Sequence, residues 1–331
     1  MKLITIDFET YYDREFSLSK LTTEEYVRSP LFEMIGVATQ INNEKPLWFP
    51  KHEVAAHLAS IDWSDAMVVA QNTAFDGAIM SWLYDITPMA WADTLGMSRA
   101  LYPHERSHSL AKQAERFRIG VKGNEVLNAL GKHYDDFSAE ELARYGSYCC
   151  NDVTLTYGLF NIYMEMGFPK TELKLIDLTL RMFTEPALVL DKEHLIDHHG
   201  DVLARKELLL DSVRRILSAD EGEDVKKLLM SNPKFAILLE NYGVEPPMKT
   251  SLTTGKQAYA FAKTDEEFQA LTEHEDDRIQ SLVAARLGNK STIEETRTKR
   301  FIDMADRGAF PVPLRYYGAH SGRWSGQDKI N

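Results

Sequence analysis

Two acidic residues near the start of the chain, Asp7 and Glu9, lie in the otherwise apolar segment of residues 3–10. Side chains alternate between the two faces of a strand, so both carboxylates should point to one face while Ile6 and Phe8 enter the opposite layer. Neighbouring carboxylates on a rigid strand repel each other unless a cation lies between them. A solvated strand end would also explain a lone acid pair, so the interpretation depends on acids elsewhere in the chain.

A second acidic motif occupies residues 71–78 and contains Asn72 and Asp76. It follows the apolar stretch 66–70 and begins a helical pattern. Asp76 should therefore lie in the first turn of a helix, at the carboxyl end of a strand. The simpler explanations are that Asp76 compensates the helix dipole and that Asn72 is an N-cap.

The third motif, in a helical stretch of about 139–163, contains Tyr148 and Asp152. A spacing of four residues places both side chains on one face of a helix. Taken alone, Asp152 has a simpler explanation as a solvated helix acid, and Tyr148 has one as an aromatic residue of the core. Together, the three motifs supply four carboxylates and one phenol.

In order and spacing, these motifs resemble those of the DEDDy family of 3′–5′ exonucleases, which remove nucleotides from the 3′ end of DNA or RNA. The matching residues are Asp7 and Glu9 of the first motif, Asp76 of the second, and Tyr148 and Asp152 of the third. The resemblance implies that these five residues are catalytic and belong to a ribonuclease-H-like exonuclease domain.

Phosphodiester hydrolysis requires such residues because its transition state carries additional negative charge. Mg²⁺ prefers oxygen ligands, and two such ions roughly 3.5–4 Å apart stabilise both the attacking and the leaving oxygen. By resemblance, Asp7 would bridge two divalent ions, Mg²⁺ in the first instance with Mn²⁺ as the alternative. Glu9 and Asp152 would hold the first ion, and Asp76 the second, largely through water. Tyr148 would orient the attacking water with help from Glu9.

Hydrophobic periodicity predicts the elements that must position these residues. The expected strands are residues 2–8, 33–41, 46–49, 66–70 and 91–94, and the expected helices are residues 51–59, 75–84, 109–117 and 139–163. This order predicts an α/β fold with a mixed sheet flanked by helices, which would form an exonuclease domain over residues 1–165. A break at residues 167–169 precedes a mainly helical, thumb-like region.

The second half of the chain resembles the polymerase region of family A (DNA polymerase I-like) enzymes. Residues 172–195 resemble the segment that enters this region, and residues 231–256 resemble its thumb. Residues 276–307 are expected to form one helix of roughly 30 residues, on the order of 45 Å long. The resemblance implies a connector and a helical thumb over residues 166–308.

The long helix is similar to the thumb helix that follows the backbone of duplex DNA. It carries Arg286, and its predicted DNA contacts are Lys290, Ser291, Thr292 and Arg297. An ordinary solvated helix face is an equally simple explanation for Lys290 or Arg297.

Residues 316–326 resemble the turn at which a family A palm begins, so residues 309–331 are predicted to be the start of a truncated palm. Arg323, in an S-G-R turn, would approach the primer strand near its minor groove. A surface arginine in a glycine-rich loop is the alternative. Trp324 departs from the leucine common in bacterial members and resembles phage versions. Asn72, beside the exonuclease acids, is added to the expected DNA contacts.

The resemblance covers nearly all of this chain but only about the amino-terminal half of a full family A enzyme. Motifs for the polymerase carboxylates and the fingers helix are not found in its 331 residues. We therefore expect the proofreading 3′–5′ exonuclease portion of a phage-like family A DNA polymerase, without polymerase activity of its own. A single-stranded 3′ end of DNA would bind at the exonuclease site and primer–template duplex at the thumb. A carboxyl-terminal polymerase half would be a further partner.

Two alternatives stay open. One is a free-standing, ribonuclease D-like DEDDy exonuclease, against which the thumb-like segments argue. The other is a non-catalytic DNA-binding subunit of a split polymerase, against which the complete set of five motif residues argues.

The composition is compatible with these expectations. At 331 residues and 44% hydrophobic content, the chain should form about two domains with packed cores. The net charge of −12 is uneven: residues 286–331 hold nine Lys or Arg and five Asp or Glu (+4), which leaves −16 for the rest and a basic strip for phosphates. The only cysteines, Cys149 and Cys150, are adjacent and are not expected to pair. Without an apparent signal peptide or membrane span, we expect a cytoplasmic protein, in the host cytoplasm if it is phage-encoded.

Overall fold

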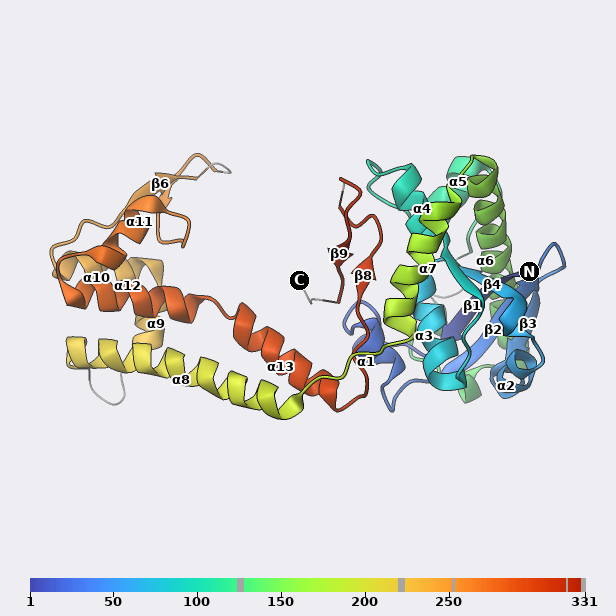
Figure 1. The fold of residues 1–331 in the computed structure, drawn as a ribbon, viewed down its shortest axis with the longest axis horizontal. Helices are drawn as coiled ribbons and strands as arrows, with labels where there is room; N and C mark the ends of the chain where they lie inside the picture. Colours follow the sequence, from blue (N-terminus) through green and yellow to red (C-terminus); the bar gives the residue numbers. More distant parts are fainter. Residues whose placement is uncertain (124–127, 220–223, 252–253, 320, 329–331) are drawn as a thin grey trace. The chain divides into compact units, whose positions relative to one another are not determined.

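The structure of the chain is a computed structural model that describes residues 1–123, 128–219, 224–251, 254–319 and 321–328 (Figure 1). It divides into two compact units, one formed by residues 1–188 with 309–331 and the other by residues 189–308. Residues 166–188 and 309–331 thus belong to the same unit as the predicted exonuclease domain. The functions assigned to these segments, connector and palm, stay predictions.

A five-stranded mixed sheet forms the centre of the first unit. Its strands are β1 (Lys2–Thr10), β2 (Met34–Ile41), β3 (Leu47–Pro50), β4 (Ala66–Ala70) and β5 (Ala90–Asp93). The strand order is β3-β2-β1-β4-β5. β1 is antiparallel to β2 and parallel to β4, while β3 is antiparallel to β2 and β5 parallel to β4. β1 is therefore the central strand, and its apolar residues Ile4 and Ile6 are buried.

Helices flank this sheet. They are α1 (Thr23–Val27), α2 (Lys51–Ala59), α3 (Thr73–Tyr84), α4 (Thr94–Leu101), α5 (Leu110–Phe117), α6 (Ala139–Glu165) and α7 (Lys170–Thr184), with 3₁₀ turns at Trp63–Asp65 and Tyr134–Asp136. α6 packs across β1, β2, β3 and β4, whereas α3 and α7 pack against each other and α7 contacts β5. The predicted α/β fold with a mixed sheet flanked by helices is confirmed. The prediction did not include the short helices α1 and α4, which begin at side-chain caps, Thr22 and Asp93.

The long helix α6 begins at a reciprocal cap and ends at a glycine. Ser138 Oγ accepts a hydrogen bond from the Glu141 backbone N–H, and the Glu141 carboxylate accepts one from the Ser138 N–H. This capping box satisfies two backbone donors that a helix start leaves unpaired. After Glu165 the chain turns at Gly167, whose φ of +85° favours glycine. The predicted helix and the break that follows it are therefore both present.

The second unit is mainly helical and has its own core. It contains α8 (Lys192–Leu217), α9 (Val225–Met230), α10 (Asn232–Asn241), β6 (Met248–Thr250), β7 (Gln257–Tyr259), α11 (Glu266–Ala270), a 3₁₀ turn at Leu271–Glu273, α12 (Asp277–Lys290) and α13 (Ile293–Ala305). α12 and α13 both pack against α8. The core includes an aromatic cluster of Phe235, Phe261 and Phe268. Among the described residues, no helix combines the length and the apolar character needed to cross a membrane.

The prediction of one helix over residues 276–307 is wrong. α12 ends at Lys290 and α13 begins at Ile293, because the backbone of Ser291 is extended, with φ −83° and ψ 117°. Ser and Thr side chains offer the backbone hydrogen bonds that compete with a helix, and Ser291 and Thr292 are adjacent here. The break lets each of the two shorter helices contact α8 separately.

Arg286 on α12 is buried, so it does not belong with the predicted DNA-facing residues. Its guanidinium donates to Leu229 O and to Asn232 Oδ1. It also lies 4.5 and 4.8 Å from the ring centroids of Phe235 and Phe261. Burial lowers the pKa of Arg286 to about 10. Arg286 therefore ties α12 to the junction of α9 and α10.

Residues 309–319 and 321–328 pack on α7 in the first unit. They contain the short strand pair β8 (Leu314–Arg315) and β9 (Ser325–Gly326). Trp324 Nε1 donates to Thr179 Oγ1 at 2.9 Å, and the Tyr316 hydroxyl donates to Glu172. Both partners are α7 residues, so this segment is part of the first unit's packing.

Candidate active site

The two acids of the first motif lie in the carboxyl-terminal half of β1, on the face covered by α6. Asp7 is opposite Ala38 and Glu9 is opposite Gly36 in the antiparallel pair with β2. Glu9 is buried and Asp7 is partly buried. A Cβ at Gly36 would lie 2.4 Å from the Trp48 ring, so glycine is required for this close packing. The small residues opposite both acids thus allow dense packing above them.

Asp76 is hydrogen-bonded to the strand that carries the first motif. It lies in the first turn of α3, as predicted, and its Oδ1 accepts a hydrogen bond from the backbone N–H of Phe8 at 3.1 Å. Phe8 is the residue between Asp7 and Glu9. Asp76 is buried. The acid of the second motif is therefore held beside both acids of the first.

Asn72 occupies the N-cap position of α3, but its side chain does not cap the helix. Its backbone is left-handed, with φ +75°, and Asp93 Oδ1 accepts hydrogen bonds from Asn72 N at 2.9 Å and Thr73 N at 3.3 Å. Asp93 also caps α4 through the N–H groups of Leu95 and Gly96. The capping explanation for the Asn72 side chain is thus wrong. Asp93 is the residue that the sequence reasoning missed, although an Asp between a strand and a helix is a recognisable cap signal.

α6 presents a row of side chains to β1. Tyr145 donates its hydroxyl hydrogen to Glu9 Oε2 at 2.6 Å. Cys149 Sγ lies 3.4 Å from Asp7 Oδ2 and 3.3 Å from the Asp7 carbonyl oxygen. Residues three or four apart share a helix face, so Tyr145, Cys149 and Asp152 all face the strand. The sequence motif did not include Tyr145 or Cys149, because only the fold shows what lies opposite them.

Tyr148 and Asp152 are both buried on α6, four residues apart. The Tyr148 ring stacks on Tyr145, with centroids 6.1 Å apart and an interplanar angle of 11°. Burial, and then the charge of Asp152, raise the pKa of Tyr148 well above its ordinary value. The phenol therefore stays protonated at neutral pH and can act as a hydrogen-bond donor.

Lys122, from the segment that follows α5, contacts the cluster of acids and tyrosines between β1 and α6. Lys122 Nζ forms an ion pair with Asp152 Oδ2 and lies 5.0 Å from the centroid of the Tyr148 ring. Its positive charge lowers the pKa of Asp7 and of Glu9, against the larger opposing effects of burial and like charge. Lys122 follows α5 in a stretch without strand or helix periodicity, so no sequence signal pointed to it.

The combined effect of burial and like charge favours a cation in this site. Burial, and then the charge of Asp152, raise the pKa of Asp7 to about 7. Burial, and then the charge of Asp7, raise the pKa of both Glu9 and Asp76. Ligand atoms of Asp7, Glu9 and Cys149 all lie within 4.8 Å of one another. Three carboxyl groups with raised pKa values, two of them buried and Asp7 partly buried, are a donor set that fits hard divalent cations.

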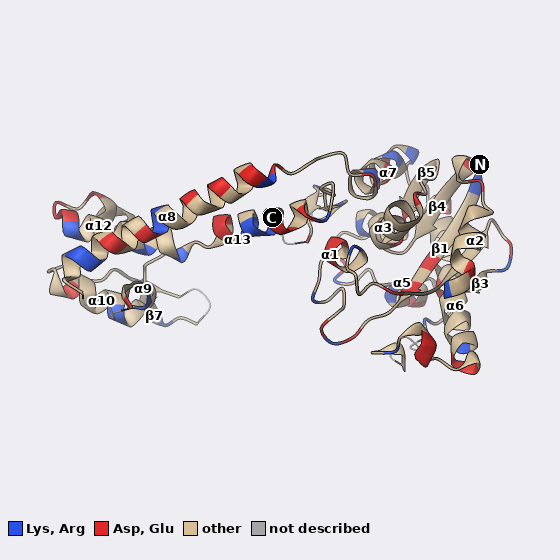
Figure 2. Ribbon diagram, turned by 90° about the horizontal axis from the view of Figure 1, so that it is seen from below, with Lys and Arg blue, Asp and Glu red and all other residues tan. Residues whose placement is uncertain are grey.

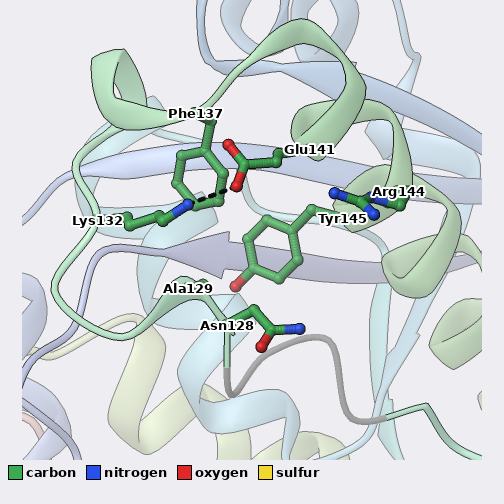
Figure 3. A pocket seen from close by; sticks show the side chains of 7 residues that line it. All are labelled: Asn128, Ala129, Lys132, Phe137, Glu141, Arg144 and Tyr145. Atoms are coloured by element: carbon green, nitrogen blue, oxygen red, sulfur yellow. Dashed lines mark hydrogen bonds and ion pairs between the residues drawn. The ribbon is translucent and has the colours of Figure 1, made fainter.

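One cavity, of about 490 Å³, opens beside Tyr145 at the amino-terminal part of α6 (Figure 3). It is lined by Asn128, Ala129, Lys132, Phe137, Glu141, Arg144 and Tyr145. Phe137 stacks on Tyr145 with centroids 5.6 Å apart, and Lys132 forms an ion pair with Glu141 at 2.6 Å (Figure 3). The cavity therefore combines an aromatic wall with charged groups one side chain away from Glu9.

A second cavity, also of about 490 Å³, opens beside Tyr148. It is lined by Val121, Gly123, Glu140, Ala143, Arg144, Ser147, Tyr148 and Asn151. Arg144 lines both cavities and is exposed. Within the described residues, Arg144 forms no ion pair, so its guanidinium is available to a ligand.

The predicted DNA contacts are divided between the two units. Asn72 and Arg323 belong to the first unit and are exposed, with Arg323 Nε donating to Ser321 Oγ at 3.0 Å. The remaining ones, Lys290, Ser291, Thr292 and Arg297, belong to the second unit, at or just after the end of α12. Of these four, Arg297 is partly buried and the other three are exposed.

Solved structures of nucleic-acid enzymes resemble this chain. No family model and no curated protein matches the sequence. NrnC from Brucella melitensis with bound Mg²⁺ gives a TM-score of 0.41 at 13% identity, covering 55% of this chain and 83% of that one. The POL domain of Pol1 from M. smegmatis, in complex with DNA primer-template and dNTP, gives a TM-score of 0.63 at 13% identity. That likeness covers 98% of this chain and 51% of the Pol1 chain. In fold, therefore, this chain is similar to a polymerase I POL domain, and it spans about half the length of that Pol1 chain.

Proposed function

We propose that this chain is a metal-dependent 3′–5′ exonuclease and forms the proofreading part of a phage-like family A DNA polymerase. One observation carries the proposal: three acids and a phenol-bearing helix from distant segments meet in a single buried site. Asp76 contacts the strand between Asp7 and Glu9, while α6 brings Tyr148 and Asp152 to the same strand face.

The carboxylates would hold two divalent ions. In this proposal Asp7, Glu9 and Asp152 hold the first ion, and Asp7 and Asp76 hold the second. The ions would supply Lewis-acid stabilisation of the negative charge that develops on the phosphate. Tyr145 fixes the orientation of the Glu9 carboxylate by donating a hydrogen bond to it, and so acts as a positioning residue.

Tyr148 orients the attacking water in this mechanism and does not remove its proton. The raised pKa keeps its phenol protonated, so the hydroxyl can donate to one oxygen and accept from another. A neutral group that only positions a water contributes less to the rate than the ions themselves.

Arg144 and the cavity beside Tyr148 would bind the DNA strand on the 5′ side of the scissile phosphate. Arg144, Tyr148 and Asp152 are spaced by four residues and lie along one face of α6. Arginine binds phosphate through charge-assisted hydrogen bonds, and among the described residues Arg144 forms no ion pair with an acid. The strand would therefore leave the acid site along α6.

Duplex DNA would contact the second unit at the junction of α12 and α13. Lys290 is exposed there and forms no ion pair within the described residues. The nearby acids Glu294 and Glu295 form ion pairs with Arg205 and Lys206 of α8, which reduces their repulsion of phosphate. With Ser291, Thr292 and Arg297, and with Asn72 and Arg323 of the first unit, Lys290 completes the proposed DNA contacts. A carboxyl-terminal polymerase half would be the protein partner.

The test is degradation of single-stranded DNA labelled at its 5′ end, with Mg²⁺ or Mn²⁺. The purified chain should shorten the strand one nucleotide at a time from the 3′ end and release 5′-mononucleotides. Asp7→Asn should abolish this activity, whereas Asp62→Asn, at an exposed acid outside the site, should not change it. Internal cleavage products, or full activity in excess chelator, would refute the proposal.

A further inference from the structure

Lys122 is a cation built into a site that the proposed function assigns to divalent ions. We infer that Lys122 is the resident counter-cation of the acid site, which a divalent ion displaces from Asp152. The inference rests on the proposed metal site. It adds that Lys122 and the divalent ion compete for one ligand of that site, Asp152. It assigns Lys122 a role in metal uptake that the exonuclease motifs do not contain.

The ion pair of Lys122 is unlike the surface pairs of this chain. The Asp152 side chain is only 4% exposed, whereas that of Lys122 is 27% exposed. A carboxylate removed from water needs a partner, so loss of Lys122 would leave an uncompensated buried charge, which costs more than breaking an exposed pair. The ammonium also lies over the Tyr148 ring, at 5.0 Å from its centroid, where the π face is negative.

The backbone that carries Lys122 is anchored while its side chain reaches into the site. Asn151 Nδ2, on α6, donates a hydrogen bond to Val121 O at 3.0 Å. Gly120, with φ +148°, takes the chain past Leu155 of α6, where a Cβ would lie 2.8 Å from the leucine side chain. A lysine side chain is long and flexible, so its ammonium can leave Asp152 without movement of this backbone.

Electrostatics make the lysine and a divalent ion compete. Both are cations, and both would bind the Asp152 carboxylate. When one of them occupies this carboxylate, the other therefore binds there less favourably. In the absence of metal, Lys122 offsets part of the repulsion among Asp7, Glu9 and Asp152. The lysine thus supports the metal-free fold and at the same time raises the metal concentration that the site requires.

Calorimetric titration of the DNA-free chain with Mn²⁺ tests the inference without any catalytic readout. Lys122→Met removes the charge and keeps most of the apolar chain, so Mn²⁺ should bind about tenfold more tightly. Lys51→Met is the matched control, because Lys51 pairs with Glu33 at 2.7 Å in the same unit but outside the acid site. Its Mn²⁺ affinity should equal that of the wild type. Equal or weaker binding by Lys122→Met would overturn the inference.

Further variants separate this inference from the proposed function. In an Asp152→Asn background, Lys122→Met should give no gain in Mn²⁺ affinity, because the contested carboxylate is gone; an unchanged gain would overturn the inference. If neither the wild type nor Lys122→Met binds Mn²⁺, the metal site is wrong and the inference falls with it. If the wild type binds and Lys122→Met binds no tighter, only the inference fails.

Thermal melting provides a second readout for the same variant. Without metal, Lys122→Met should melt at a lower temperature than the wild type, because the buried acids lose their counter-charge. Saturating Mn²⁺ should raise its melting temperature by more than that of the wild type. If the Lys122→Met variant does not fold, Lys122→Gln replaces it in the same measurement. A melting temperature unaffected by Lys122→Met and by Lys122→Gln would contradict the stabilising half of the inference.

Discussion

The protonation of Asp7 decides what the acid site can bind. Burial and the charge of Asp152 raise its pKa from 3.8 to about 7, and burial is also the main cause of the raised pKa values of Glu9 and Asp76. The metal-free site therefore retains protons at pH values at which exposed carboxylates are ionised. Cation binding must release these protons, so metal affinity should increase as the pH rises through about 7.

The metal-free protein should lose part of its stability between about pH 4 and pH 7. A carboxyl group whose pKa is raised on folding stabilises the folded state below its unfolded value of 3.8, and this contribution is lost as the pH passes its folded value of about 7. Asp7→Asn removes this titration. The melting temperature of the wild type minus that of Asp7→Asn should therefore fall by roughly 5 °C across this range. Calorimetry in excess chelator measures it, and a constant difference would contradict the raised pKa of Asp7.

Asp7→Ala should reduce exonuclease activity more than Tyr148→Phe does. Asp7 is proposed to bridge both ions, so its loss should remove the cation site and leave the other acids in mutual repulsion. Tyr148 supplies a single hydrogen bond, and loss of one such donor should lower the rate by on the order of 10²–10³. Single-turnover rates and Mn²⁺ affinity are the measurements. Equal losses of rate in both variants, with Mn²⁺ still bound, would show that the roles are assigned wrongly.

At the scale of elements, α6 does most of the positioning. It packs across four strands, begins at a capping box, and carries Tyr145, Tyr148, Cys149 and Asp152 to the face of β1 that bears Asp7 and Glu9. Gly146 permits this proximity, because a Cβ there would lie 2.5 Å from the Trp48 ring of β3. One rigid helix thus holds the acid site and the walls of both neighbouring cavities.

The position of Arg144 on α6 predicts a dependence on substrate length. A dinucleotide with one phosphodiester has only the scissile phosphate, whereas a trinucleotide has a second phosphate that Arg144 can contact. Arg144→Gln should therefore raise KM for trinucleotides and longer strands by about tenfold and leave dinucleotide cleavage nearly unchanged. Steady-state kinetics on the two lengths measure the effect.

Arg106→Gln is the matched control for this prediction. Arg106 is exposed in the same unit and lines a different cavity, which none of the five motif residues lines. Its substitution should leave both KM values unchanged. An equal effect of Arg144→Gln on the two lengths would place Arg144 at the scissile phosphate instead of upstream of it.

Periodicity predicted the elements of the first unit well because its strands and longer helices are strongly patterned. The five motif residues lie on the elements expected for them: Asp7 and Glu9 on β1, Asp76 in the first turn of α3, and Tyr148 and Asp152 on α6. Lys122, Tyr145 and Cys149 could not be placed in the site, since their contacts cross between distant segments. The break between α12 and α13 was missed although residues 288–292 (Gly-Asn-Lys-Ser-Thr) interrupt the apolar pattern there, where the backbone of Ser291 is extended.

At the scale of the whole molecule, the described residues hold one group of metal-ligating side chains, formed by Asp7, Glu9 and Cys149. The second unit carries many charges, and acidic and basic residues alternate along α8 (Figure 2). These charges form surface ion pairs such as Arg214 with Glu207, which do not create a cation site.

This chain should degrade a primer and should not extend it. Nucleotide addition requires its own metal-binding acids beside the 3′ hydroxyl, and the acids of the first unit are proposed to serve hydrolysis. With primer–template, all four deoxynucleotides and Mg²⁺, gel analysis should show shortened products only. Extension by the 331-residue chain would refute the proposed division of functions. Extension that appears on addition of a carboxyl-terminal polymerase half would support it, and no response to such a partner would favour a free-standing nuclease.

The buried guanidinium of Arg286 affects how loss-of-binding mutants of the second unit must be interpreted. Its hydrogen bonds to Leu229 O and Asn232 Oδ1, and its contacts with two phenylalanine rings, make it part of the core. Any substitution of Arg286 would destabilise the second unit. In a DNA-binding screen, the resulting loss of affinity could not be distinguished from the loss of a phosphate contact. Separation-of-function alleles should therefore be sought at Lys290, whose exposed side chain can be changed without unfolding its surroundings.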